Sequence, residues 1–333
     1  MKFSEMAYAR PDVEAVSKEI KDIIERINKA QSAEEQLQAH KDYNELCKKV
    51  ETMYTLAYIR HTINTEDEFY DKEKEFYDEN LPILQSLNFD FYKAFVASKF
   101  RKELEEKLGS LLFRNAELEL KAFDPKIIPD LQEENKLVSE YVKLMASAQL
   151  DIDGKKVNLS QLRFYMESPD RNIRKEAFKK RTEFFSENGE KFDEIFDKLV
   201  KVRTAMAKKL GFEDFVELGY IRMRRNCYGP DDVAAFKEEV KKYMVPLSLR
   251  IQEKKKKMLG LEKITVIDQL LYFREGNPNP KGTPEEIFEN GKKMYDELSK
   301  ETSEFFRFML ENDLLDCLSR KGKAPGGYMT FIP

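Results

Sequence analysis

Side chains that could hold a metal ion are scarce in this chain. It has two histidines, His40 and His61, and neither lies in a His-Glu-x-x-His motif, where two histidines on adjacent helical turns hold zinc and the glutamate activates water. His40 and Cys47 are about two helical turns apart, roughly 10 Å along a helix axis, which is too far to share one ion. We therefore expect both histidines to be surface or partly buried helix residues, and no metal site in the chain.

Motifs for nucleophilic or phosphate chemistry are also missing. The sequence has no Gly-x-Ser-x-Gly elbow, no Cys-x-x-Cys and no Gly-x-x-x-x-Gly-Lys. Three distant cysteines give no disulfide framework and fit a reducing cytoplasm, and each is most simply a small buried apolar residue: Cys47, Cys227 and Cys317. Arg222, Arg224 and Arg225 cluster where a helix should end, and pairing with acids or helix carbonyls is a commoner role for them than ligand binding. No catalytic constellation is complete.

The last stretch of the chain, Lys321–Pro333, has a pattern of its own. A turn signal at Gly326 and Gly327 is followed by alternating β-favouring residues from Tyr328 and Met329 onward. Such alternation predicts a strand. A lone strand leaves its backbone donors and acceptors unpaired, so two interpretations stay open. The stretch is either a frayed tail or the first strand of a sheet whose other strands are not in this chain.

Composition limits the class of protein that positions these residues. The chain has 333 residues, with 58 basic and 62 acidic side chains and a net charge of −4. This even balance argues against a nucleic-acid binder, which usually has a strong basic excess. No stretch approaches the ~18 apolar residues of a membrane span, and the N-terminus lacks the apolar run of a secretory signal. We therefore expect a soluble cytoplasmic protein without nucleic-acid or membrane partners.

Helical periodicity dominates the first half. We expect a helix whose first residue is Pro11, a second over Ala33–Ile63, and a third opened by a capping box at Thr65. Pro82 should close or kink the third helix, and further helices should cover 88–108 and 111–123. A hairpin near 150–157 is indicated by its Asp-Gly turn. The same segment fails as a calcium loop because its twelfth position lacks the bidentate glutamate.

The second half continues the helical pattern. A long amphipathic region should run over 168–210, followed by a short helix over 212–220. Asp231 or Asp232 should cap a helix that ends near Leu259. Thr283 should cap the last helix pair, which we expect to end near Leu318. The fold class is therefore all-α, mainly helical with antiparallel helix packing, with one or two short β-hairpins.

Several segments together resemble one family. The central matches look like oligoendopeptidase F, a group of thimet-oligopeptidase-like zinc metallopeptidases: Asp193–Arg203, Ala207–Phe212 and Glu217–Tyr228. Further similar segments flank them in the expected order: Asn64–Tyr70, Asp78–Pro82, Ser168–Ala177, and Lys321–Lys323 with Gly326–Tyr328. The resemblance covers essentially the whole chain. It implies a hollow helical ellipsoid with a substrate channel, an incomplete zincin-like peptidase that hydrolyses internal bonds of short peptides.

In that family the zinc ligands come from a His-Glu-x-x-His helix and a glutamate on a later helix. The resemblance implies that these lie beyond Pro333, so no catalytic or metal residue can be assigned in this chain. What it assigns is an edge strand that binds the substrate backbone, at Gly326, Gly327, Tyr328 and Met329. It also suggests three parts: an N-terminal helical domain over 1–110, a middle region over 111–187, and the first part of the catalytic domain over 188–333.

Two hypotheses for function follow. In the first, the chain is part of a zinc metalloendopeptidase, supplies the channel wall and edge strand, and is inactive alone because its zinc cofactor and the C-terminal remainder of the peptidase domain are missing. In the second, it is a non-catalytic helical module, a natural truncation that binds peptides or a protein partner. A His-Glu-x-x-His sequence within about 40 residues after Pro333 would favour the first, and a stop codon would favour the second.

Overall fold

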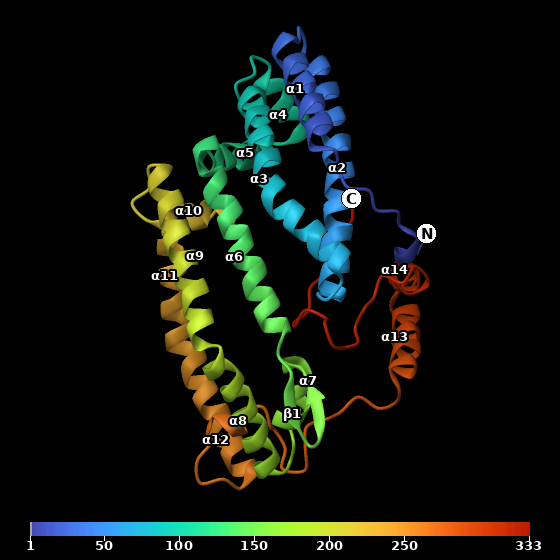
Figure 1. Cartoon of the computed structure of the whole chain (residues 1–333), viewed down its shortest axis with the longest axis vertical. Coiled ribbons are helices and arrows are strands. Elements are labelled where there is room, and N and C mark those ends of the chain that lie inside the picture. The colour runs from blue at the N-terminus through green and yellow to red at the C-terminus, as the bar shows by residue number, and fades with distance from the viewer. Residues whose placement is uncertain (1) are drawn as a thin grey trace.

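The computed structural model describes residues 2–333. It is 71% helix with one two-stranded sheet, as the sequence predicts. Figure 1 shows the helices arranged around an open centre, with the earliest helices at one end and the hairpin at the other. No helix among residues 2–333 is both long and apolar enough to cross a membrane.

The N-terminal part is a bundle of antiparallel helices. Its helices are α1 (Val13–Lys29), α2 (Ala33–Ile63), α3 (Glu68–Val96), α4 (Arg101–Leu108) and α5 (Ser110–Ala122). Isoleucines at helical spacing on α1 and stacked aromatic rings between α2, α3 and α5 form its core. The ring of Tyr43 stacks on Phe91 at a centroid distance of 3.6 Å, and Phe95 stacks on Phe113 at 5.4 Å. This core makes α2 and α3 rigid supports.

Two predicted helix starts in this part are wrong, and one of two alternatives for Pro82 is excluded. The first helix is capped by Asp12, whose carboxylate accepts from two amides of its first turn, so Pro11 lies outside it. Asp67, and not Thr65, caps α3 in the same way. An aspartate is a strong acceptor for the orphan amides of a helix start, and in both places it stands closer to the apolar periodicity. The third helix also continues through Pro82 to Val96 and does not close there.

The middle part leads away from this bundle. After a 3-10 turn at Pro125–Ile127, α6 (Ile128–Ala146) descends to the predicted hairpin of β1 (Leu150–Ile152) and β2 (Lys155–Val157). Asp153 and Gly154 both have positive φ, at 52° and 69°, which is the conformation of a two-residue hairpin turn. The hairpin prediction is confirmed, and its buried residues pack on α7 (Leu159–Met166) and α8 (Arg171–Glu187).

The amphipathic region predicted over 168–210 forms two helices. Asp170 caps α8, and a break at Asn188 separates it from α9 (Gly189–Lys209). The next helix, α10 (Phe215–Arg222), packs with α6 and α9 in a small core that includes the fully buried Met206 and Leu218.

The last helices form two extended arms. α11 (Pro230–Glu239) passes through a π-helical turn at Val240–Met244 into α12 (Val245–Leu259). Pro246 follows this turn, and a wider turn is how a continuing helix accommodates a proline ring and its missing N–H. Pro230 opens α11, and Asp232 accepts from the Gly229 amide, so neither aspartate is the cap residue that was predicted.

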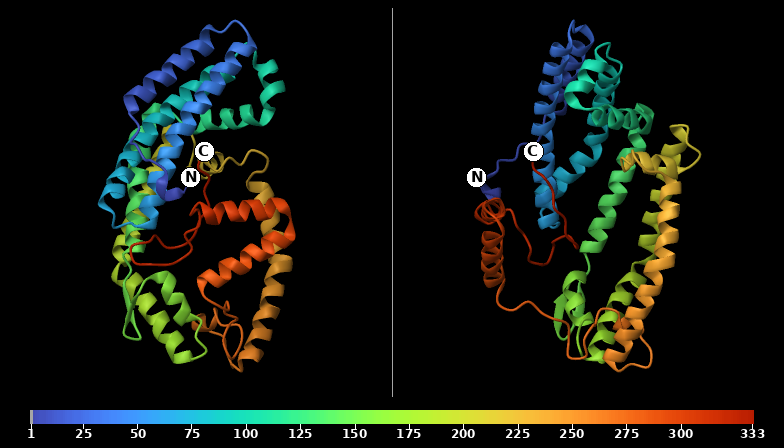
Figure 2. Two further views of the ribbon diagram at one scale, coloured as in Figure 1. Left: turned by 90° about the vertical axis from the view of Figure 1, so that its right-hand side faces the viewer. Right: turned by 180° about the vertical axis from the view of Figure 1, so that it is seen from behind.

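The final helix pair is α13 (Pro284–Leu298) and α14 (Lys300–Glu311). Thr283 caps α13 as predicted, with Glu286 completing the capping box. The pair ends at Glu311 and not near Leu318, because Asp313 has a positive φ that ends the helix and the chain then continues without regular structure. Figure 2 shows this last segment crossing from α14 toward α2.

Candidate functional site

The C-terminal tail, Lys321–Pro333, lies along the second half of α2. Hydrogen bonds join the two from Thr65 N to Gly322 O (2.7 Å), from Ala324 N to Thr62 O (2.9 Å) and from Thr52 Oγ1 to Pro333 O (3.0 Å). The order of these contacts shows that the tail runs antiparallel to the helix. Its end lies beside α2 in Figure 1. The tail is therefore not frayed, because one rigid helix holds both of its ends.

The predicted strand is not formed within this chain. The only sheet among residues 2–333 is the hairpin, whose strands pair with each other and not with the tail. Within the described chain, the backbone from Pro325 to Ile332 makes no backbone hydrogen bond. The tail thus has backbone donors and acceptors that are available to another chain.

The two glycines of the predicted site differ in what they require. Gly326 has a φ of +94°, a conformation that side-chain-bearing residues rarely adopt. A Cβ atom added at either Gly326 or Gly327 would meet no heavy atom within 4 Å. The backbone is therefore open to approach here, whereas at Gly322 a Cβ would lie 3.0 Å from the side-chain oxygen of Asn64.

Tyr328 and Met329 face opposite ways. The Tyr328 hydroxyl lies 2.5 Å from Thr62 Oγ1, and its ring lies 5.5 Å from that of Tyr58. Partial burial raises the pKa of the Tyr328 phenol, so the hydroxyl stays protonated at neutral pH. Met329 is 92% exposed. The structure places all four predicted residues on one segment, with Tyr328 as its anchor on α2.

An ionic clasp fixes the turn that precedes the tail. The Asp316 carboxylate accepts from Arg320 Nη2 at 2.7 Å and from Lys323 Nζ at 2.9 Å. The hydrogen bond from Arg320 is the main reason that the pKa of Asp316 is lowered to about 2, and Lys323 adds to it. The carboxylate therefore stays charged at physiological pH and directs the chain onto α2.

Both histidines are buried, so the expectation of surface or partly buried positions is wrong. His40 stacks on Phe95 in the core of the N-terminal bundle. His61 is 3% exposed, its Nε2 lies 3.2 Å from Asp71 Oδ1, and Lys143 Nζ lies 2.7 Å from the same oxygen. Burial lowers the pKa of His61. Among residues 2–333, no three His, Cys, Asp or Glu side chains are placed to hold a metal ion.

The arginine cluster is paired with acids, as the sequence suggests. Arg222 donates to Glu134 at 2.7 Å, and Arg224 donates to Glu119 at 2.6 Å. The guanidinium of Arg225 instead lies over the ring of Tyr220, 4.3 Å from its centroid. These contacts tie α10 and the following loop to α5 and α6, and the cluster needs no ligand to account for it.

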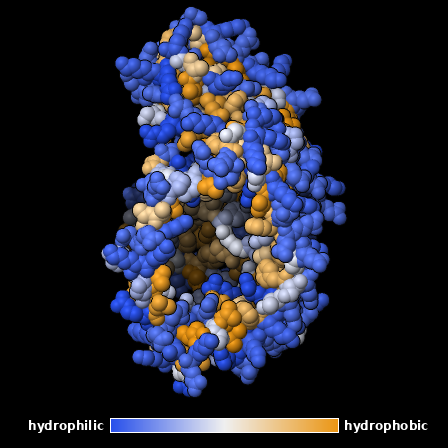
Figure 3. Space-filling model, turned by 90° about the vertical axis from the view of Figure 1, so that its left-hand side faces the viewer, coloured by the Kyte–Doolittle hydropathy of each residue, from blue (hydrophilic) through white to orange (hydrophobic). Residues whose placement is uncertain are grey.

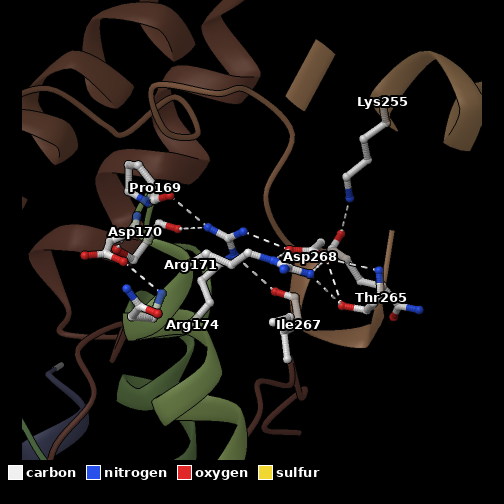
Figure 4. A network of polar contacts seen from close by, with 11 residues as sticks. Pro169, Asp170, Arg171, Arg174, Lys255, Thr265, Ile267 and Asp268 are labelled. Carbon is white, nitrogen blue, oxygen red and sulfur yellow. Dashed lines mark hydrogen bonds and ion pairs between the residues drawn. The ribbon is translucent and has the colours of Figure 1, made fainter. Parts of the chain in front are cut away.

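A buried network around Asp268 was not found from the sequence. The carboxylate is fully buried and accepts from Arg174 Nη2 at 2.8 Å and from Arg171 Nε and Nη2 at 3.1 Å each (Figure 4). The Thr265 amide and hydroxyl donate to Asp268 Oδ2 at 3.0 and 2.8 Å. Lys255 holds the neighbouring Gln269 carbonyl.

This network holds the pKa of Asp268 well below its usual range. Burial alone would raise that pKa, but the hydrogen bonds from Arg171, Arg174 and Thr265 outweigh it. The charged carboxylate therefore locks the irregular segment over 260–283 onto the first turn of α8. That segment leads directly into α13 and α14, so the network fixes the position from which these two helices extend.

One face of the molecule is hollowed. Figure 3 shows a deep opening at mid-height with apolar side chains on its inner wall. Such a concave apolar surface is the usual form of a ligand site. The tail passes from the end of α14 to α2 in Figures 1 and 2.

Comparisons with known proteins agree with this architecture. Residues 3–123 match the peptidase M3 N-terminal domain, and residues 164–333 match peptidase family M3. No curated protein matches the chain.

Solved structures give the same result. The chain is 50% identical to a structure described as PZ peptidase A with inhibitor 2, with a TM-score of 0.98, covering 99% of this chain and 59% of that one. It is 47% identical to a putative oligoendopeptidase F, with a TM-score of 0.98, covering 100% and 59%. A putative oligoendopeptidase F from Bacillus anthracis str. Ames is 44% identical, with a TM-score of 0.98, covering 100% and 61%.

The chain thus spans 59–61% of the length of these solved relatives. Over that span it has their fold, and more than half of it matches the family's catalytic region. The chain belongs to peptidase family M3 and is oligoendopeptidase F-like.

Proposed function

We propose that the chain is part of a zinc metalloendopeptidase that hydrolyses internal bonds of short peptides. Its helices would form the wall of a substrate channel, and its tail would be the edge strand that binds the substrate backbone. The observation that carries this proposal is the backbone of the tail, which makes no backbone hydrogen bond from Pro325 to Ile332 and is held along α2 in a chain with the family's fold.

The four residues of the tail would act through their backbone. A peptide laid beside Gly326, Gly327, Tyr328 and Met329 could form a two-stranded ladder with their free N–H and C=O groups. Main-chain hydrogen bonds do not depend on side-chain identity, which suits a peptidase of broad specificity. Thr62 would keep the ladder in place by holding Tyr328.

The metal would be held outside this chain. Family M3 is generally zinc-dependent, but the side chains of residues 2–333 do not form a metal site. We therefore derive no catalytic step for this chain and propose that the zinc ligands lie in the part of the fold that the solved relatives have and this chain does not cover. The chain alone should bind no stoichiometric zinc and cleave no peptide. Chelator-sensitive hydrolysis by the purified 333-residue chain would refute this.

The proposed division and location have separate support. We propose the division 1–110, 111–187 and 188–333, whose second boundary falls where α8 ends; its first boundary lies inside α5, whose Phe113 packs in the core of the N-terminal bundle. The cysteines are free; Cys47 is partly buried and Cys227 and Cys317 are exposed, so the expectation of three buried apolar residues is wrong. Exposed thiols persist in a reducing compartment, so we propose the cytoplasm as the location.

A peptide-binding experiment tests the tail's role. A labelled oligopeptide should bind the chain weakly, with fluorescence anisotropy as the measurement. A peptide of the same sequence with methylated backbone nitrogens should lose at least tenfold in affinity because it cannot donate to the tail. A peptide of scrambled sequence should bind like the original. Equal binding of the methylated peptide would contradict a backbone ladder.

The alternative, a non-catalytic module that binds peptides or a protein, is favoured by one observation, the absence of a metal site among residues 2–333. It would give the same binding results. It would differ in a longer chain made with the uncovered part of a solved relative, where it predicts binding without cleavage.

A further inference from the structure

The last turn of α2 provides several of the hydrogen bonds that hold the C-terminal tail and the turn before it. The Thr62 carbonyl accepts from the Ala324 amide at 2.9 Å, and the Thr62 hydroxyl oxygen lies 2.5 Å from the Tyr328 hydroxyl. The neighbouring Ile63 carbonyl accepts from Arg320 Nη2 at 3.2 Å. The position of this one helical turn therefore determines where the tail lies.

His61 joins this turn to two other helices. Its Nε2 lies 3.2 Å from Asp71 Oδ1 on α3, and the Asp71 carboxylate also accepts from Lys143 Nζ on α6, at 2.7 and 3.0 Å. Burial alone would raise the pKa of Asp71, but the hydrogen bonds from Lys143 and His61 lower it. The carboxylate is therefore charged and accepts the ring N–H of a histidine that is 3% exposed.

We propose that His61 is a positioning residue for the tail and that its protonation releases the tail from α2. His61 acts through Thr62 and Ile63, which follow it in the same helical turn, and takes no part in chemistry. The inference deepens the proposed function, on which it rests, because it adds regulation by pH to the peptide-binding tail. A released tail has no fixed position in which to form a ladder with a peptide.

The surroundings of the His61 ring oppose its protonation. The charged groups that face the ring are Asp71 and Lys74 on α3 and Lys143 on α6. Burial is the main reason that the pKa of His61 is lowered from 6.5, the two lysines add to it, and Asp71 offsets only part of it. An exposed His61 therefore binds a proton more readily than the buried one, so a fall in pH below about 6.5 favours a conformation in which the ring leaves its site.

The chain contains a matched control for this titration. Its other histidine, His40, is 6% exposed and stacks on Phe95 at a centroid distance of 5.1 Å. Burial lowers the pKa of His40 as well. His40 lies roughly 30 Å from His61 along the axis of α2, too far to act on the last turn directly. The pKa of Asp316 is lowered to about 2, so the ion pairs of the turn before the tail do not titrate between pH 7 and pH 5.

Hydrogen exchange followed by mass spectrometry tests the proposal on the full 333-residue chain between pH 7 and pH 5, with rates corrected for the intrinsic pH dependence of exchange. In wild type, the segments over 60–65 and 321–325 should lose protection at least about threefold in acid. His61→Gln keeps a donor for Asp71 but does not titrate, so it should have wild-type protection at pH 7 and show no loss at pH 5. His40→Gln should lose protection as wild type does.

Lys143→Gln is the second variant, and it decides the test if His61→Gln does not fold. Lys143 is 39% exposed, and its removal takes away a positive charge that opposes protonation of His61, so the acid-induced loss should shrink. Three results would overturn the proposal: equal protection of wild type at both pH values, an unchanged loss in His61→Gln, or a loss that His40→Gln abolishes. An unchanged loss in Lys143→Gln would overturn it as well.

Peptide binding separates this role from the proposed function. A labelled oligopeptide without groups that titrate in this range should bind wild type at least about threefold more weakly at pH 5 than at pH 7 by fluorescence anisotropy. His61→Gln should bind it equally at both pH values. Release of the tail in acid without any change in peptide affinity would support the role of His61 and contradict peptide binding by the tail.

Discussion

Among residues 2–333, Asp268 supplies the only carboxylate that hydrogen-bonds the buried Arg174 guanidinium, and replacing it by asparagine removes that charge. Arg174 is 3% exposed and would keep its bonds to the carbonyls of Ser168 and Pro169, at 2.8 and 2.9 Å. Removing one member of a buried ion pair costs about 3–5 kcal/mol. The remaining carbonyls and the exposed side chain of Arg171 put Asp268→Asn at the lower end, about 3 kcal/mol.

The loss of stability should first open the segment around Asp268 and only then unfold the whole chain, because the chain has separate cores. Hydrogen exchange followed by mass spectrometry should show segment 260–283 opening at neutral pH, with urea unfolding followed by circular dichroism as the second measurement. The matched control is Asp197→Asn, which breaks an exposed pair with Lys201 and should cost less than about 0.5 kcal/mol.

The pH dependence of the unfolding free energy provides a second, independent test of the Asp268 network. The folded-state pKa of Asp268 is lowered from 3.8, so its contribution is present above that value and is lost as pH falls toward the folded-state value. The difference between wild type and Asp268→Asn should therefore shrink below about pH 4. A loss no larger than that of Asp197→Asn, or a difference that does not change with acid, would refute this account of the network.

Two further predictions concern the tail. Thr62→Val removes the hydroxyl that meets Tyr328, which should cost about 1 kcal/mol and speed limited proteolysis of the tail about fivefold; an unchanged rate would show that Thr62 does not anchor it. Acidification should release the ion pairs of Asp316 with Arg320 and Lys323. The pKa of Asp316 is about 2 in the folded chain against 3.8 unfolded. The stabilisation that these ion pairs give, about 1 kcal/mol after solvent screening, is therefore lost as pH falls from about 4 to about 2. Hydrogen exchange of residues 316–323 should show this release in wild type, whereas Asp316→Asn should already be released at neutral pH.

Elements determined by local sequence were predictable. The bounds of α2 match the expected Ala33–Ile63, and the hairpin follows from its Asp153-Gly154 turn. Errors arose where tertiary packing outweighs a local signal. Pro82 is buried within α3, where the core of the bundle stabilises the helix against the proline's missing hydrogen bond.

The candidate site was predictable only in part. Tyr328 and its neighbours could be singled out from composition and family resemblance, but their anchor Thr62 is 266 residues away in sequence. The Asp268 network joins residues 94 and 97 positions apart. Nothing in the local sequence of an arginine or an aspartate indicates such a partner, because ion pairs between distant segments depend on the folded arrangement.

The most direct test of the central claim is peptide hydrolysis by a completed enzyme. The 333-residue chain would be fused to the uncovered part of the 47% identical oligoendopeptidase F and given an internally quenched oligopeptide, with mass spectrometry of the products. The account predicts cleavage at internal bonds that a chelator abolishes, zinc restores and Gly326→Val reduces. A folded fusion that binds zinc stoichiometrically but leaves the peptide intact would contradict it.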